Sequence, residues 1–196
     1  MTPRITIHRS FNPPSAPQPG LLRRYADDHA SQIVELALSL PLLVLFAIGI
    51  FDFSGALALK QKLTNAAREG ARVAAADPAS DLYVTSGVPV SVSDALQVIE
   101  NYLASEKINP CGLPGSVAQS QLTWTYQSNA GCPGTGITLA INRGCLTLEN
   151  GVYLAGTCVT ISYAYKWQYS SAPGLLGLTF IGPSTITTTA TAFNEN

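Results

Sequence analysis

Residues 36–51 (LALSLPLLVLFAIGIF) form a run of sixteen residues without a charged side chain, and this run restricts most strongly what the chain can fold into. As an α-helix the run covers about 24 Å, slightly less than a ~30 Å hydrocarbon core. Extending it to residues 33–59 gives a membrane-spanning length, provided that Glu35 and Asp52 are accommodated. Apolar side chains surround such a helix on every face, which is typical of a membrane helix. The sequence therefore predicts a transmembrane helix at about residues 33–59.

Two other interpretations of this run are a buried core helix and the apolar part of a cleaved secretory signal. The even distribution of apolar residues around the helix argues against a core helix. A secretory signal is disfavoured because the small residues 74–76 lie too far beyond the run for signal peptidase. Pro41 removes a helix hydrogen bond to Ala37 and predicts a bend, which membrane helices tolerate.

Charge is sparse in this chain, and basic residues are concentrated toward the N-terminus. Charged residues make up 12% of the sequence and the formal net charge is −1. Because there is no basic tract, the sequence predicts no nucleic-acid partner. Four arginines precede the apolar run, and the proline-rich stretch 10–20 (SFNPPSAPQPG) needs no folded structure. Residues 1–30 are therefore interpreted as a basic leader.

A long polar leader directly before an apolar helix indicates cleavage before the helix rather than after it. A cut after Ala30 would make Ser31 the new N-terminus and leave the helix on the mature protein. Glu35 would then lie one helical turn into an apolar segment, where a carboxylate needs a partner or a proton. We expect this partner to be the free α-amino group of Ser31, from the same or a neighbouring subunit. The alternative is that Glu35 only favours the positive end of the helix.

The cysteines all follow the apolar run and indicate where the rest of the chain lies. They form no C-x-x-C pair, so two disulfides are favoured over a zinc ribbon or a redox centre; the cysteines are Cys111, Cys132, Cys145 and Cys158. Three connectivities are possible, and pairing Cys111 with Cys132 and Cys145 with Cys158 is the simplest. Disulfides persist in oxidising compartments, which places residues 77–196, called the head below, outside the cytoplasm.

Residues 56–76 keep helical character between the apolar run and the head. Small and apolar residues recur there at three- and four-residue steps and form a narrow stripe, whose members are Leu59, Leu63, Ala66, Ala67, Gly70, Ala71 and Ala74. Small residues let helices approach closely, so the stripe fits either another subunit or the chain's own head. One helix over residues 31–76 would be about 69 Å long, far more than a bilayer requires.

The head is predicted to contain one helix and several strands. Ser93 is a suitable N-cap for a helix over residues 94–106, and Pro110 follows that helix. Alternating apolar residues predict strands at residues 122–127, 136–141, 145–148, 158–169 and 185–193. The expected fold class is α+β, with a long membrane-spanning N-terminal helix, a small disulfide-bonded antiparallel sheet and one short helix.

Aromatic residues recur along the predicted strands. They are Trp124, Tyr126, Tyr163, Tyr165, Trp167 and Tyr169. Packing in the core or on the sheet is the expected role, because aromatic side chains are common in strands. A ligand-binding surface is the alternative.

The head lacks the residues of common catalytic and metal sites. Both histidines, His8 and His29, lie in the leader, which excludes Ser-His-Asp and Cys-His catalysis and histidine-ligated metals from the mature chain. Its acidic residues are scattered, and the glycine-rich segments 112–116 and 131–136 lack the lysine of a phosphate-binding loop. We therefore expect no enzymatic activity, no cofactor and no metal.

Four short motifs in and after the apolar run together resemble a known family. They are V-E at residues 34–35, L-P-L at 40–42, G-I-F-D-F at 49–53 and N-A-A-R-E-G-A-R at 65–72. Over residues 31–75 the chain resembles the TadE-like pseudopilins of the tight-adherence (Tad) pilus system, a branch of type IV pili. The family usually has glycine before the cleavage site and often an aromatic residue after the glutamate, where this chain has Ala30 and Leu36.

The resemblance implies a function and partners. It implies a type IV pilin-like helix that a prepilin peptidase cuts between Ala30 and Ser31, and that then assembles with other pilin subunits. Glu35 matches the family's acidic residue near the mature N-terminus, and Pro41 and Asp52 lie on the same helix, Asp52 near the outer membrane interface. We expect a pilin-like subunit in the cytoplasmic membrane or the extracellular pilus, acting in pilus assembly and surface adhesion. The alternative is an uncleaved, single-pass membrane protein whose extracytoplasmic domain binds a ligand.

Overall fold

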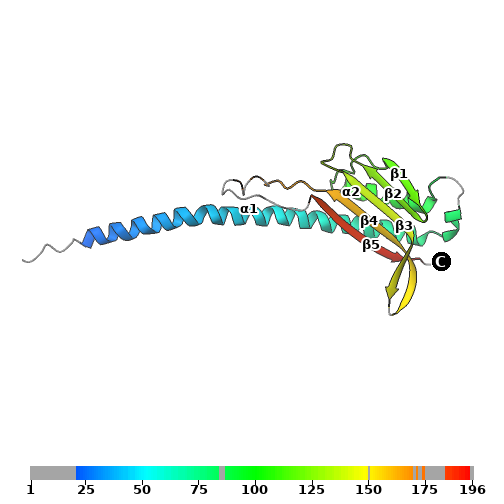
Figure 1. Cartoon of the computed structure of the whole chain (residues 1–196), viewed down its shortest axis with the longest axis horizontal. Helices are drawn as coiled ribbons and strands as arrows, with labels where there is room; N and C mark the ends of the chain where they lie inside the picture. Colours follow the sequence, from blue (N-terminus) through cyan, green and yellow to red (C-terminus); the bar gives the residue numbers. More distant parts are fainter. Residues whose placement is uncertain are drawn as a thin grey trace, which may run out of the picture. The chain divides into compact units, whose positions relative to one another are not determined.

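A computed structural model describes residues 21–83, 87–149, 151–169, 171, 174 and 184–194, with side chains from residue 31 onward. Met1–Val44 and Leu45–Asn196 form two compact units, and the tertiary contacts discussed below lie within the second. The architecture is α+β, as expected, with a long apolar N-terminal helix, an antiparallel five-stranded sheet and two disulfides (Figure 1). The elements are α1 (Leu21–Ala76), the 3-10 helix η1 (Ala79–Tyr83), α2 (Val90–Ser105), β1 (Ser116–Ser120), β2 (Thr123–Ser128), β3 (Ile137–Glu149), β4 (Val152–Ala164) and β5 (Thr185–Phe193).

The long helix α1 contains 56 residues and includes Pro41. It ends at Ala76, as the sequence pattern predicts, but it begins at Leu21 rather than at Ser31. The bond between Ala30 and Ser31 therefore lies in helical backbone, and its cleavage stays a prediction. The proline-rich stretch 10–20 lies outside the described residues.

The sheet is a meander in which sequential strands pair antiparallel in the order β1-β2-β3-β4-β5 (Figure 1). β5 has the predicted bounds, whereas the two strands predicted at residues 136–141 and 145–148 are parts of the single strand β3. The sequence Asn142-Arg143-Gly144 separates the two apolar stretches, which explains the split in the prediction. The pairing of β3 with β4 shifts its register at the same place. β1 gives no sequence signal, because all five of its residues are exposed.

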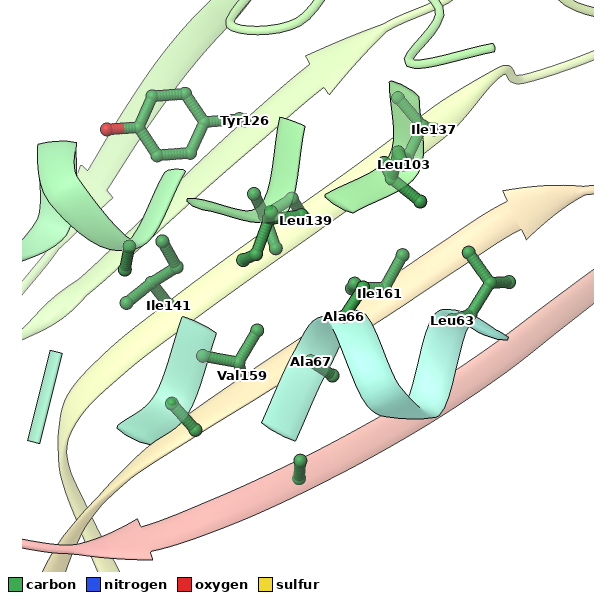
Figure 2. Close-up of a cluster of buried hydrophobic side chains, with 14 of the residues drawn as sticks. Leu63, Ala66, Ala67, Leu103, Tyr126, Ile137, Leu139, Ile141, Val159 and Ile161 are labelled. Carbon is green, nitrogen blue, oxygen red and sulfur yellow. The ribbon is translucent and has the colours of Figure 1, made fainter. Parts of the chain in front are cut away.

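The stripe of small residues on α1 packs against the chain's own head. The stripe members with no exposed surface are Leu63, Ala66, Ala67, Ala71 and Ala74. Ala66 and Ala67 belong to the same buried cluster as Val159 and Ile161 of β4 (Figure 2). Of the two partners that the sequence left open for the stripe, the head is therefore the one that covers it.

The start of α2 differs from the prediction. Ser93 is not the N-cap, since α2 begins at Val90 and the Ser93 hydroxyl donates a hydrogen bond to the Val90 carbonyl at 2.8 Å. The carboxylate of Asp81 in η1 instead accepts a hydrogen bond from the backbone N–H of Ser91 at 2.8 Å. The unpaired N–H groups of a helix start need an acceptor, and here a residue ten positions earlier supplies it.

The two disulfides join Cys111 to Cys132 and Cys145 to Cys158, the pairs that the sequence favoured. The first closes the segment that contains β1 and β2, and the second links β3 to β4. Among the strand aromatics, Trp124 is 2% exposed and Tyr126 is 3% exposed. Both rings are therefore part of the core.

Replacement of Gly70 by alanine is expected to destabilise the head by about 1 kcal/mol, because overpacking costs more than the gain in helix propensity returns. A Cβ atom at Gly70 would lie 2.5 Å from Cδ1 of Ile99 on α2, so the buried Ile99 side chain or the helix itself would have to shift. Urea unfolding followed by fluorescence measures the change. Gly49→Ala on the same helix is the matched control, since a Cβ there meets nothing within 4 Å. Equal stability of the two variants would contradict the close approach of α1 and α2.

Candidate membrane anchor and its junction with the head

Residues 31–51 of α1, called the anchor below, present apolar side chains to their surroundings, and none of these residues is buried. Leu38 is 76% exposed, Ile50 is 70% exposed and Phe51 is 74% exposed. Exposed apolar surface of this extent indicates a lipid or protein partner. By length and composition the helix over Ser31–Ala76 can cross a membrane. The chain therefore has an N-terminal helix suited to membrane anchoring.

The predicted assembly residues Glu35 and Pro41 both lie on the anchor and are exposed. Pro41 has no backbone N–H to bond the Ala37 carbonyl, yet α1 continues through it. Ala30 and Ser31 lie in the helical turn before Glu35. Their roles in processing and assembly stay predictions.

Among the described residues, Asp52 is the first buried residue along α1. It is 8% exposed, although it directly follows the exposed Phe51. Its Oδ1 accepts a hydrogen bond from the backbone N–H of Gln168 at 3.1 Å, and its Oδ2 accepts one from the N–H of Tyr169 at 3.2 Å. Hydrogen bonds to a charged acceptor are stronger than those between neutral groups. Asp52 thus ties the chain that follows β4 to the helix.

The segment tied by Asp52 is aromatic. Residues 165–169 (YKWQY), called the aromatic segment below, are predicted as the end of a strand, but they follow β4 without strand structure. The Tyr165 hydroxyl donates a hydrogen bond to the Asp52 carbonyl at 3.4 Å, and its ring meets Trp167 edge to face at 5.0 Å between centroids. A Cβ at Gly55 would lie 3.3 Å from that hydroxyl, so a small residue permits the approach. Burial, and secondarily the charge of Asp52, raises the pKa of Tyr165.

Polar contacts continue along the covered part of α1. The hydroxyls of Thr64 on α1 and Thr188 on β5 lie 2.8 Å apart. Lys62 forms an ion pair with Glu106, just after α2, at 3.0 Å. Together with Asp52, these contacts join α1 to three different parts of the head.

At the end of α1, the buried side chain of Arg143 joins the helix to the sheet. Arg143 is 2% exposed and lies on β3. Its Nη2 donates to the carbonyl of Asp77 at 2.9 Å and lies 3.9 Å from the Asp81 carboxylate, while its Nη1 donates to the Thr157 hydroxyl at 3.2 Å. Burial lowers the pKa of Arg143, and the charges of Asp81 and Asp77 oppose this. An arginine in a strand gives no sequence signal for such a role, because charged strand residues are usually exposed.

A second ionisable side chain, Glu100, has fewer hydrogen-bond partners than Arg143. Oε1 of Glu100 on α2 is buried and has no hydrogen-bond partner within the described part of the chain. Burial raises the pKa of Glu100. The pKa of Tyr126 on β2 is also raised, by burial and then by the charge of Glu100. Both shifts indicate that the Glu100 carboxylate is unfavourable in its charged form.

Glu100→Gln is expected to stabilise the head at pH 7 by less than about 1 kcal/mol. The variant removes a charge with one buried, unpaired oxygen, but solvent screens the rest of this half-buried side chain. A raised folded-state pKa means that the folded protein holds its proton to higher pH than the unfolded chain does, so stability is lost as pH rises through that pKa. The gain should therefore vanish below the ordinary glutamate pKa. Urea unfolding at neutral and at acidic pH measures it. Glu149→Gln, at an exposed position, is the control. A gain of the same size at both pH values would contradict the explanation.

Comparison with known proteins bears on the helix that carries the anchor. The family model described as "TadE-like protein" matches residues 30–72, about a fifth of the chain. No curated protein and no solved structure matches the chain. The matched residues include Glu35, Pro41 and Asp52 and most of the stripe that packs on the head. The resemblance that the sequence motifs indicate is thus confirmed over residues 30–72: this part of the chain is similar to the TadE-like family.

Proposed function

We propose that this protein is a pilin-like subunit of a Tad pilus, inserted in the cytoplasmic membrane and acting in pilus assembly and surface adhesion. A prepilin peptidase cuts between Ala30 and Ser31, and the anchor stays on the mature chain. The head lies outside the cytoplasm. The subunit acts through contacts with other pilin subunits along its helix, and it carries out no catalytic step.

The observation that carries this proposal is the coincidence of TadE-like sequence with an uncovered apolar helix of membrane length. The family match includes the whole anchor. From Ser31 to Asp52 the helix rises about 31 Å, close to the ~30 Å thickness of a hydrocarbon core. The head contacts α1 at Asp52, the first buried residue along the described helix. This agreement supports a membrane whose outer boundary lies near Asp52.

Glu35 has a specific role in this proposal. After cleavage, the new amino group of Ser31 would lie one helical turn from the Glu35 carboxylate. An ionised carboxylate in hydrocarbon is strongly disfavoured unless a cation neutralises it. The amino group of a neighbouring subunit can supply the same charge, so this pair would favour helices packed in register.

The disulfides support the proposed membrane orientation, in which the head lies outside the cytoplasm. Cys111–Cys132 and Cys145–Cys158 both lie in the head. Disulfides form and persist outside the reducing cytoplasm. An extracytoplasmic head with an N-terminal leader on the cytoplasmic side accounts for both bonds.

The second candidate function, an uncleaved anchored protein that binds a ligand through strand aromatics, has less support. Trp124 and Tyr126 lie in the core and offer almost no exposed surface. Tyr165 contacts α1 at Asp52 and packs against Trp167, whereas the Tyr163 hydroxyl donates a hydrogen bond to the Asn109 carbonyl.

Complementation in the native cell tests the proposed function. A deletion strain should lose its pili and regain them with the wild-type gene. Glu35→Ala should be processed and inserted normally but restore few or no pili, because the unpaired amino group has lost its carboxylate. Glu149→Ala, an exposed position in the head, is the matched control and should restore piliation. Normal pili in the deletion strain would overturn the proposal, and normal pili with Glu35→Ala would overturn the role of the pair.

A further inference from the structure

We propose that the aromatic segment is a membrane contact of the head and lies in the lipid headgroup layer of the bilayer that the anchor crosses. The proposal rests on the proposed function, since it requires that the anchor span a membrane. It adds a second contact with the membrane, made by a part of the chain more than one hundred residues after the anchor.

The first support is the position of the segment along α1. Gln168 and Tyr169 bond to Asp52, and Asp52 directly follows the last residue of the anchor. Phe51 is 74% exposed and Phe53 is 58% exposed, so apolar surface flanks the point of attachment. The hydrogen bonds thus hold the aromatic segment beside exposed apolar side chains of α1, at the first buried residue along the described helix.

The second support is the chemistry of the segment. Tyrosine and tryptophan are enriched where membranes meet water, because their rings are apolar and their polar groups remain hydrated. Lysine in the same position can extend its charge toward the headgroups. The segment contains Tyr165, Lys166, Trp167 and Tyr169, a composition that fits this layer.

The third support is partial exposure. Trp124 in the core is 2% exposed, whereas Tyr169 is 48% exposed and Lys166 and Gln168 are also exposed. Trp167 packs partly against the core and contacts Tyr165. The segment is therefore fixed to the head on one side and open on the other, as a contact with lipid requires.

The two tryptophans of this chain allow a direct test. Trp124→Phe leaves Trp167 as the single fluorophore, and Trp167→Phe leaves Trp124 as a matched control. Each full-length variant is reconstituted into phosphatidylcholine–phosphatidylglycerol vesicles whose lipids carry bromine, a fluorescence quencher, near the headgroup or near the chain end. Trp167 should lose fluorescence with bromine near the headgroup, and lose less of it with bromine near the chain end. Trp124 should be nearly unaffected by either lipid. Equal emission of Trp167 in brominated and plain vesicles would overturn the proposal.

A third variant separates this inference from membrane insertion itself. Leu43→Trp, in a chain that lacks both native tryptophans, places the fluorophore about 14 Å deeper along the helix than Asp52. Bromine near the chain end should quench it most strongly. If this variant is quenched while Trp167 is not, the anchor stands and the membrane contact of the head is refuted. If neither is quenched, the proposed anchoring fails, and the contact fails with it.

Discussion

Replacement of Arg143 by methionine should lower the free energy of unfolding of the head by about 3–5 kcal/mol, the usual cost of removing one partner of a buried ion pair. Methionine keeps much of the side-chain volume, so the loss reports the charge and its hydrogen bonds. The variant leaves the Asp77 carbonyl and the Thr157 hydroxyl without the guanidinium donors and the Asp81 carboxylate without its nearby charge. Urea unfolding at neutral pH with both disulfides intact measures the effect.

The control is Arg72→Met, which removes an arginine from an exposed ion pair. The Arg72 side chain is 69% exposed and its guanidinium bonds to Glu69. An exposed pair of this kind contributes little to stability, because water and salt screen it. Equal destabilisation by the two substitutions would mean that Arg143 does not hold the end of α1 to the sheet.

Replacement of Asp52 by alanine should release the backbone of Gln168 and Tyr169 from α1 while the sheet stays folded. Two hydrogen bonds from backbone N–H groups to a charged acceptor are lost, each worth about 1.5–3 kcal/mol. The amide protons of Gln168 and Tyr169 should therefore exchange with solvent at least about 100-fold faster. Hydrogen–deuterium exchange, resolved to single amides, measures the change.

Amides inside β4 provide the internal control for this variant. Val159 and Ile161 are fully buried and pair with both neighbouring strands, so their exchange should stay close to that of the wild type. Asp52→Asn keeps one carbonyl oxygen as acceptor and should give a smaller effect. If the amides of Gln168 and Tyr169 keep their protection in Asp52→Ala, the carboxylate does not hold the segment.

The anchor and most of the sheet can be predicted from the sequence because their signals are local. The charge-free run at residues 36–51 and the alternation in β5 each indicate their own element without reference to distant residues. The stripe of small residues predicts that α1 packs closely against something, but not what it packs against. Its spacing indicates close packing. Small residues allow close approach to another subunit as well as to the chain's own head, so the spacing does not identify the partner.

The contacts that join α1 to the head are not predictable in this way. Asp52 binds residues more than one hundred positions later, and no periodicity in the sequence connects them. Asp81 caps α2 from outside the helix, which a search for a local N-cap misses, and Arg143 looks like an exposed strand residue. In each case a charged side chain bonds to residues that are distant in the sequence. Its role can therefore be recognised only when the positions of the strands and helices are known.

The most direct test of the account is the N-terminal sequence of the protein isolated from its native cell. Processing between Ala30 and Ser31 distinguishes a pilin-like subunit from an uncleaved membrane protein that carries a similar helix. The account predicts that the mature chain begins at Ser31, with Glu35 one helical turn away. A chain that begins at Met1 in cells with an active prepilin peptidase would contradict it.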